Sequence, residues 1–167
     1  MTEALHSHVA ILRLNTQLFL NCLEGVIEAD GMGRVTHNTN SLAFIAVHLV
    51  DARHFLAQEL GLELAHPFAE TLADVQSIDD TERLPSLVEL RTAWEGVSAP
   101  LTERLAAAGD QLLDASPSQA YPVDDPSMLG GIAFLLQHEA FHIGQMALLR
   151  KQLGYPSMSY PTGEPNG

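Results

Sequence analysis

The stretch Gln137-His138-Glu139-Ala140-Phe141-His142-Ile143-Gly144-Gln145, near the C-terminus, decides how the rest of the chain is interpreted. His138 and His142 are four residues apart, so on a helix their side chains leave the same face one above the other. Two imidazoles in this arrangement can bind one metal ion, whereas a hydrogen-bonded pair of core histidines is the simpler alternative. The surrounding face is largely apolar, which predicts that both histidines point into the interior. That face consists of Met128, Gly131, Phe134, Leu135, Phe141, Gln145, Met146, Leu149 and Leu153.

The composition is that of one globular domain. The 167 residues are 46% hydrophobic and 17% charged, which suits a single sizeable core. We therefore expect one domain over residues 1–167, with a loose tail over about 157–167. The only cysteine, Cys22, excludes an internal disulfide and fits a reducing compartment. Its place on an apolar helix face predicts a buried, inert thiol.

The charge and the hydropathy pattern exclude several classes of partner. The formal net charge of −13 argues against nucleic acid and anionic membrane surfaces. No apolar stretch approaches the ~20 residues of a membrane span, and the N-terminus lacks the pattern of a secretion signal. We expect a cytoplasmic protein that binds neither membranes nor nucleic acids.

Apolar residues recur at helical spacing in four segments, and no segment has a convincing strand pattern. The expected helices cover residues 4–28, 41–60, 85–113 and 127–153. Asp30-Gly31-Met32-Gly33 is expected to end the first helix, and Gly61 the second. These segments predict an all-α four-helix bundle. The connection over residues 62–84 is long, which favours a crossover between helices 2 and 3, with a short helix within residues 69–77.

A third histidine, His48, lies in the middle of an apolar face of the second expected helix. Alone it would be interpreted as a core histidine, but beside two other inward histidines it is the natural third metal ligand. Asp51, one turn further on, could accept a hydrogen bond from an imidazole, although a surface carboxylate is the simpler interpretation. His54 and His66 are expected on the surface.

Two known types of metal site do not fit. His138-Glu139-x-x-His142 matches the zinc-peptidase motif, in which Glu139 would be the general base. That motif needs a further ligand downstream, but after His142 the chain has no histidine and its only carboxylate is Glu164 in the tail. A ferritin-like site needs a Glu-x-x-His pair on each of two helices, which this chain lacks.

The sequence resembles the DinB-like (DinB/YfiT-type) family of small bacterial four-helix bundles. The resemblance rests on His48 in the second helix and on a His-x-x-x-His-x-Gly-Gln run in the last. That run is formed by His138, His142, Gly144 and Gln145, and the resemblance covers nearly the whole chain.

The resemblance implies an open site in which His48, His138 and His142 bind one divalent metal ion. Zn²⁺ or Ni²⁺ is expected first, with Fe²⁺ or Co²⁺ as alternatives. It also implies a homodimeric, metal-dependent enzyme for a small-molecule substrate, either a thiol-dependent S-transferase that uses a low-molecular-weight thiol or a hydrolase. Glu139 is the candidate catalytic residue. The candidate pocket residues, which core packing explains equally well, are Asn15, Gln145 and Trp94.

A non-catalytic protein is the alternative from another class. It would be a dimeric binding or stress-associated bundle whose histidines hold a structural metal or line the core. An anionic thiol conjugate would need a basic pocket mouth; Arg53 and Arg91 could serve, but the spacing selects neither. An enzyme requires a pocket of about 300 Å³ or more that reaches the metal.

Overall fold

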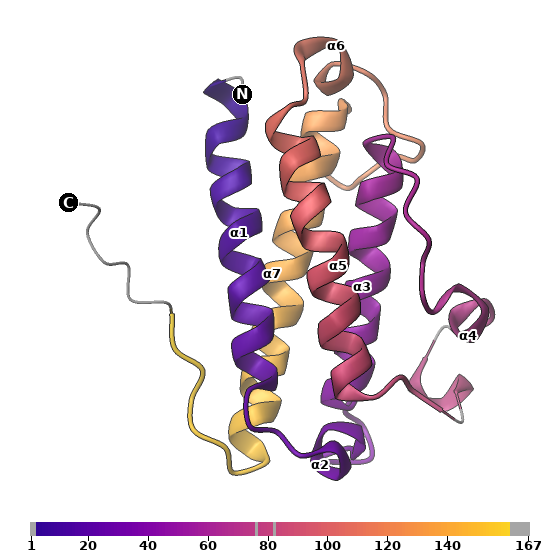
Figure 1. The fold of residues 1–167 in the computed structure, drawn as a ribbon, viewed down its shortest axis with the longest axis vertical. Helices are drawn as coiled ribbons and strands as arrows, with labels where there is room; N and C mark the ends of the chain where they lie inside the picture. Colours follow the sequence, from indigo (N-terminus) through magenta and orange to yellow (C-terminus); the bar gives the residue numbers. More distant parts are fainter. Residues whose placement is uncertain (1–2, 76, 82, 161–167) are drawn as a thin grey trace.

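The computed structural model describes residues 3–75, 77–81 and 83–160, and within these ranges the regular secondary structure is entirely helical (Figure 1). This confirms the predicted all-α class. Four long helices form the bundle: α1 (Glu3–Leu23), α3 (Leu42–Glu59), α5 (Leu87–Ala106) and α7 (Met128–Gln152). Short helices lie in the connections: α2 (Glu28–Met32), α4 (Ala69–Leu72), the 3-10 turn η1 (Ile78–Asp80) and α6 (Asp110–Leu113). None of the helices described is both long and apolar enough to cross a membrane.

The four long helices occupy the corners of a square. α1 packs against α5 and α7, and α3 packs against the same two helices, so α1 and α3 lie on a diagonal. α1 and α7 run in one direction along the bundle, and α3 and α5 run in the other (Figure 1). Because α3 and α5 are parallel neighbours, the chain between them must return along the bundle. Residues 60–86 make this return, as predicted for the crossover.

Two predicted helix boundaries are wrong. The first helix ends at Leu23 because the chain turns at Gly25, which has a φ of 69° that favours glycine. Gly31, expected to end that helix, lies inside α2 instead. The third helix stops at Ala106, and the residues that we assigned to its last turns form the separate α6.

The helix starts are fixed by serine caps. The Ser41 hydroxyl accepts a hydrogen bond from the Phe44 N–H at the start of α3, and Ser127 caps α7 in the same way. Ser86 and Glu89 form a reciprocal capping box at the start of α5. These local bonds mark where α3, α5 and α7 begin.

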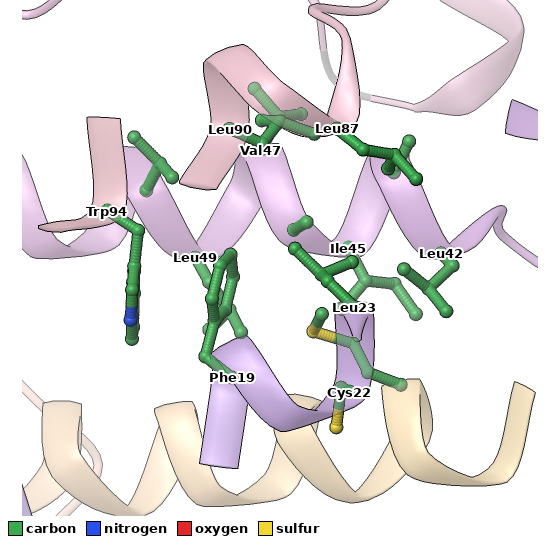
Figure 2. Close-up of a cluster of buried hydrophobic side chains, with 14 of the residues drawn as sticks. Phe19, Cys22, Leu23, Leu42, Ile45, Val47, Leu49, Leu87, Leu90 and Trp94 are labelled. Carbon is green, nitrogen blue, oxygen red and sulfur yellow. The ribbon is translucent and has the colours of Figure 1, made fainter. Parts of the chain in front are cut away.

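The apolar core consists of two clusters, one towards each end of the bundle. The cluster at the α2 end, drawn in Figure 2, includes Phe19 and Trp94, whose rings stack with centroids 4.0 Å apart. Cys22 is fully buried in it, as predicted. Burial raises the pKa of the Cys22 thiol to about 12, so the thiol stays protonated and unreactive.

Candidate metal site

Three histidines from two helices meet on one side of the bundle: His48 from α3, and His138 and His142 from α7. The Nε2 atom of His138 lies 3.2 Å from Nε2 of His48 and 3.1 Å from Nε2 of His142. The ligand atoms that the three residues offer all lie within 4.8 Å of one another. The cluster is therefore assembled across the packed α3–α7 pair.

The spacing of these nitrogens fits a metal ion. In a tetrahedral zinc site with Zn–N distances of about 2.1 Å, neighbouring nitrogens are about 3.4 Å apart. The two Nε2 separations at His138, 3.2 and 3.1 Å, are close to that value. Imidazole nitrogens also suit Ni²⁺, Fe²⁺ and Co²⁺, so the donor set admits each of the ions expected from the sequence.

The protonation states of these rings favour a cation between them. Burial, followed by the charges of His142 and His48, lowers the pKa of His138 to about 4. Burial and His142 also lower the pKa of His48, against a smaller opposing effect of Asp51. Both rings are therefore neutral at pH 7, and a neutral imidazole has one bare nitrogen that can bind a metal.

Hydrogen bonding at the outer ring nitrogens points the same way. Nδ1 of His142 lies 2.7 Å from Oε1 of Gln145; since a carbonyl oxygen only accepts, Nδ1 carries the proton and Nε2 carries the lone pair. No such bond fixes the tautomer of His138, because its Nδ1 atom is buried and has no hydrogen-bond partner among the residues described. A single Nε2–H could satisfy one of the two close contacts of His138, whereas a divalent cation satisfies all three nitrogens.

The rotation of α7 differs from the prediction. The histidines are only partly buried, and Phe141, which we assigned to the inward face, is 56% exposed. Glu139, which we did not assign to that face, is 2% exposed. The physical reason is that α7 carries apolar residues around most of its circumference, so periodicity alone does not fix which face is buried. Glu139 pairs inside the core with a counter-charge on α3, Arg53, so the buried face of α7 includes this carboxylate.

A cavity of about 270 Å³ opens at His48 and His142, slightly smaller than the pocket of about 300 Å³ that we expected for an enzyme. α3 forms one wall, and the crossover connection contributes Leu72 and Val75. Among the described residues, its lining contains one carboxylate and neither lysine nor arginine. The described residues that line it are Asn40, Phe44, Val47, His48, Asp51, Leu72, Val75 and His142.

Asp51 joins this cavity to the crossover connection. We had considered this carboxylate as a hydrogen-bond acceptor for an imidazole of the metal site. Instead, its Oδ1 atom lies 3.3 Å from Nε2 of His66. Because the Phe68 N–H donates to Nδ1 of His66, the proton of neutral His66 sits on Nε2, facing Asp51. His54 packs against His66, with ring centroids 4.4 Å apart. Both rings are partly buried, which corrects the expectation that they lie on the surface.

Of the three candidate pocket residues, the structure brings only Gln145 to the histidines. Asn15 donates to Glu139 and to the Leu136 carbonyl inside the core. Trp94 is fully buried and donates to the Thr16 carbonyl. None of the three candidates, Gln145 included, is among the residues that line the cavity.

The candidate catalytic residue, Glu139, and the two candidate basic residues of the pocket entrance, Arg53 and Arg91, also lie outside the cavity lining. Both oxygens of Glu139 accept hydrogen bonds from Arg53, so this carboxylate lies in the core and not in the cavity lining. Arg53 is fully buried, and Arg91 does not line the cavity. The sequence analysis missed this ion pair, although each residue interrupts an otherwise apolar helix face: Leu56 and Ala57 follow Arg53, and Leu135 and Ile143 flank Glu139.

Comparison with known proteins gives a family and a fold. A family model described as the DinB superfamily matches residues 11–146. The structure is similar to that of YfiT from Bacillus subtilis, described as a probable metal-dependent hydrolase with an unusual four-helix bundle topology. The TM-score is 0.66 at 13% sequence identity, over 93% of this chain and 91% of the YfiT chain, a likeness of fold. No curated protein matches the chain.

Proposed function

The chain belongs to the DinB superfamily, and from that premise we propose that it is a metal-dependent enzyme that hydrolyses a small molecule. His48, His138 and His142 would hold one divalent ion, with Zn²⁺ or Ni²⁺ first. The observation that carries this proposal is the meeting of three Nε2 atoms beside a cavity of about 270 Å³. Three protein ligands are the number found in catalytic zinc sites, whereas structural sites have four.

The residues around the histidines have separate roles in this proposal. A bound divalent ion would supply Lewis-acid chemistry and lower the pKa of a water molecule. Gln145 accepts the Nδ1 proton of His142 and so keeps the Nε2 lone pair of that ring available. Asp51 replaces Glu139 as the candidate proton acceptor, because it lines the cavity while Glu139 is held by Arg53.

The cavity lining favours an uncharged substrate. Phe44, Val47, Leu72 and Val75 give it an apolar side, and no lysine or arginine is among the described residues that line it. An anionic thiol conjugate would find no cation among these residues. We therefore rank hydrolysis above thiol transfer as the candidate activity. The fold that the chain shares with YfiT supports the same order. A thiol-dependent S-transferase is the second candidate, because the apolar side would also suit an apolar electrophile.

Activity of the Zn²⁺- or Ni²⁺-loaded protein tests this proposal. The wild type would be assayed on neutral p-nitrophenyl esters, and separately on an epoxide with a low-molecular-weight thiol. His142→Ala removes a ligand, and His54→Ala is the matched control, because His54 is a partly buried histidine of α3 outside the cluster.

We expect ester hydrolysis by the wild type and the His54→Ala variant, and none by His142→Ala. Consumption of the epoxide only when the thiol is present would support the transferase instead. Equal turnover by His142→Ala would contradict the enzyme site. Bound metal without turnover on either panel would favour the non-catalytic bundle.

The homodimer is a separate proposal carried by the family resemblance. Multi-angle light scattering of the full chain would test it. We expect twice the 18.1 kDa chain mass, and the mass of one chain would contradict the proposal.

A further inference from the structure

We infer that the buried ion pair between Arg53 and Glu139 is a positioning element for the metal site. It fixes the register of α3 against α7 and thereby brings the three histidines together. This inference rests on the proposed metal-binding function, and it assigns a role to two residues that do not themselves contact the cavity.

The pair is bidentate and fully enclosed. Arg53 Nε donates to Glu139 Oε1 at 2.7 Å, and Nη2 donates to Oε2 at 3.1 Å. The side chains of Arg53 and Glu139 are 0% and 3% exposed. Two parallel hydrogen bonds between planar groups permit a narrow range of relative positions.

All four long helices hold this pair. From α1, the Leu12 carbonyl and the Thr16 hydroxyl accept from Arg53, and Asn15 donates to Glu139. From α5, Ser98 accepts from Arg53, and the Trp94 ring lies 3.5 Å from the guanidinium carbon. Every nitrogen of Arg53 is hydrogen-bonded, so the network is saturated and has no capacity left for a ligand.

The network forms a polar layer between the two apolar clusters of the core. On α3, one cluster includes Val50 and the other begins at Leu56, and Arg53 lies between them. On α7, Leu136 belongs to one cluster and Ile143 to the other, on either side of Glu139. Aliphatic side chains alone discriminate weakly between neighbouring registers, whereas a buried polar group at one level specifies a single register.

The histidines lie close to this layer on the same two helices. Arg53 is five residues after His48, and Glu139 is adjacent to His138 and three residues before His142. Sliding or rotating α7 against α3 would therefore move His138 and His142 away from His48. Metal ligation tolerates only about 0.2 Å in each ligand distance, so a small change of register would weaken binding.

The positioning role can be separated from a contribution to stability. Replacing a buried ion pair by well-packed apolar residues is often neutral or stabilising. The double variant R53M/E139L should therefore keep the fold and the melting temperature while losing the register constraint. R150M is the matched control, because Arg150 is a buried arginine of α7 that donates to the Cys22 and Glu24 carbonyls of the chain around the end of α1.

The experiment titrates Co²⁺ into each metal-free protein, follows affinity by calorimetry and geometry by visible absorption, and records each melting temperature. We expect one Co²⁺ per wild-type chain. R53M/E139L should bind at least about 10-fold more weakly with an altered spectrum, at an unchanged or higher melting temperature. R150M should melt at a lower temperature but bind as the wild type does.

Wild-type affinity and an unchanged spectrum in folded R53M/E139L would overturn the inference while leaving the metal site intact. A wild type that binds no Co²⁺ would contradict the proposed function, and the inference with it. Should the double variant fail to fold, E139Q keeps the side-chain shape and one acceptor oxygen. Weakened binding by E139Q then supports the inference, and wild-type binding overturns it.

Discussion

The bundle contains two polar centres on the same pair of helices, and they differ in how their polar atoms are satisfied. In the ion-pair centre, every nitrogen of Arg53 donates a hydrogen bond and each oxygen of Glu139 accepts at least one. In the histidine centre, three neighbouring Nε2 atoms converge, and Nδ1 of His138 has no partner among the residues described. Glu139 and His138 are adjacent in sequence, so one helical step separates the two environments.

This difference teaches how to recognise a site in a helical core. A buried polar group that finds all its partners within the protein is stable without a ligand, because its desolvation is compensated. Converging lone pairs without donors are costly unless something else binds them. The saturated centre therefore belongs to the architecture of the bundle, and the unsaturated centre is where a ligand is expected.

The largest effect is expected from removing a ligand of the unsaturated centre. His142→Ala should weaken metal binding by more than about 100-fold, because loss of an outer partner alone costs about 10- to 100-fold. The metal-free protein should remain folded, since His142 is only partly buried. Calorimetric titration with Zn²⁺ measures the first effect and thermal melting the second. Unchanged affinity beside a much lower melting temperature would reverse the roles assigned to the two centres.

Breaking the saturated centre should, unlike the loss of His142, destabilise the fold. Glu139→Ala leaves Arg53 buried without its counter-charge, which should lower the free energy of unfolding by about 3–5 kcal/mol. Urea denaturation measures this change in the free energy of unfolding. Glu95→Ala, at an exposed carboxylate of α5, is the control and should change stability by no more than about 0.5 kcal/mol. A loss as small as that of the control would show that the pair is not needed for folding.

A smaller effect is expected at the outer partner of the metal site. Gln145→Ala removes the acceptor for Nδ1 of His142 and should weaken Zn²⁺ binding by about 10-fold. Stability should change little, because Gln145 is partly exposed. An affinity equal to that of the wild type would mean that the hydrogen bond does not orient the ring.

The smallest effect concerns Cys22 in the apolar core. The folded protein keeps the thiol proton up to a pKa of about 12, whereas the unfolded chain loses it near 9.0. The folded state therefore binds more protons in this window, so stability should fall as pH rises from 9 towards 12. Chemical denaturation below and within the window measures this loss, which should be smaller in Cys22→Ala. An equal loss in both proteins would assign it to other groups.

The fold could be predicted from the sequence because its determinants are local. Helical spacing of apolar residues located the four long helices, and the caps found in the structure, Ser41 and Ser127, coincide with the predicted first residues of the second and fourth helices. The length of the connection before α5 favoured the crossover that is found. The end of the first helix was misplaced because two glycine signals follow it, Gly25 and Gly31, and only the first adopts the left-handed conformation that ends it.

The three histidines of the candidate site could also be selected from spacing and resemblance, and they are the ones that meet in the structure. The residues that surround these histidines could not be predicted from the sequence. The partner that buries Glu139 is Arg53, which lies 86 positions earlier on another helix, so no periodicity along α7 reports it. The contact of Asp51 with His66 depends on the path of the crossover connection, which carries no regular pattern.

The metal content of the untagged protein, measured by elemental analysis beside a His48→Ala variant, tests the assignment of the histidine centre most directly. His48 comes from α3 and the other two histidines from α7, so the variant tests whether the packed helix pair forms one site. We predict about one divalent ion per wild-type chain and a loss of that ion in His48→Ala. No metal in either protein, even after loading with Zn²⁺ or Ni²⁺, would contradict the metal site and leave a bundle with a histidine-lined cavity.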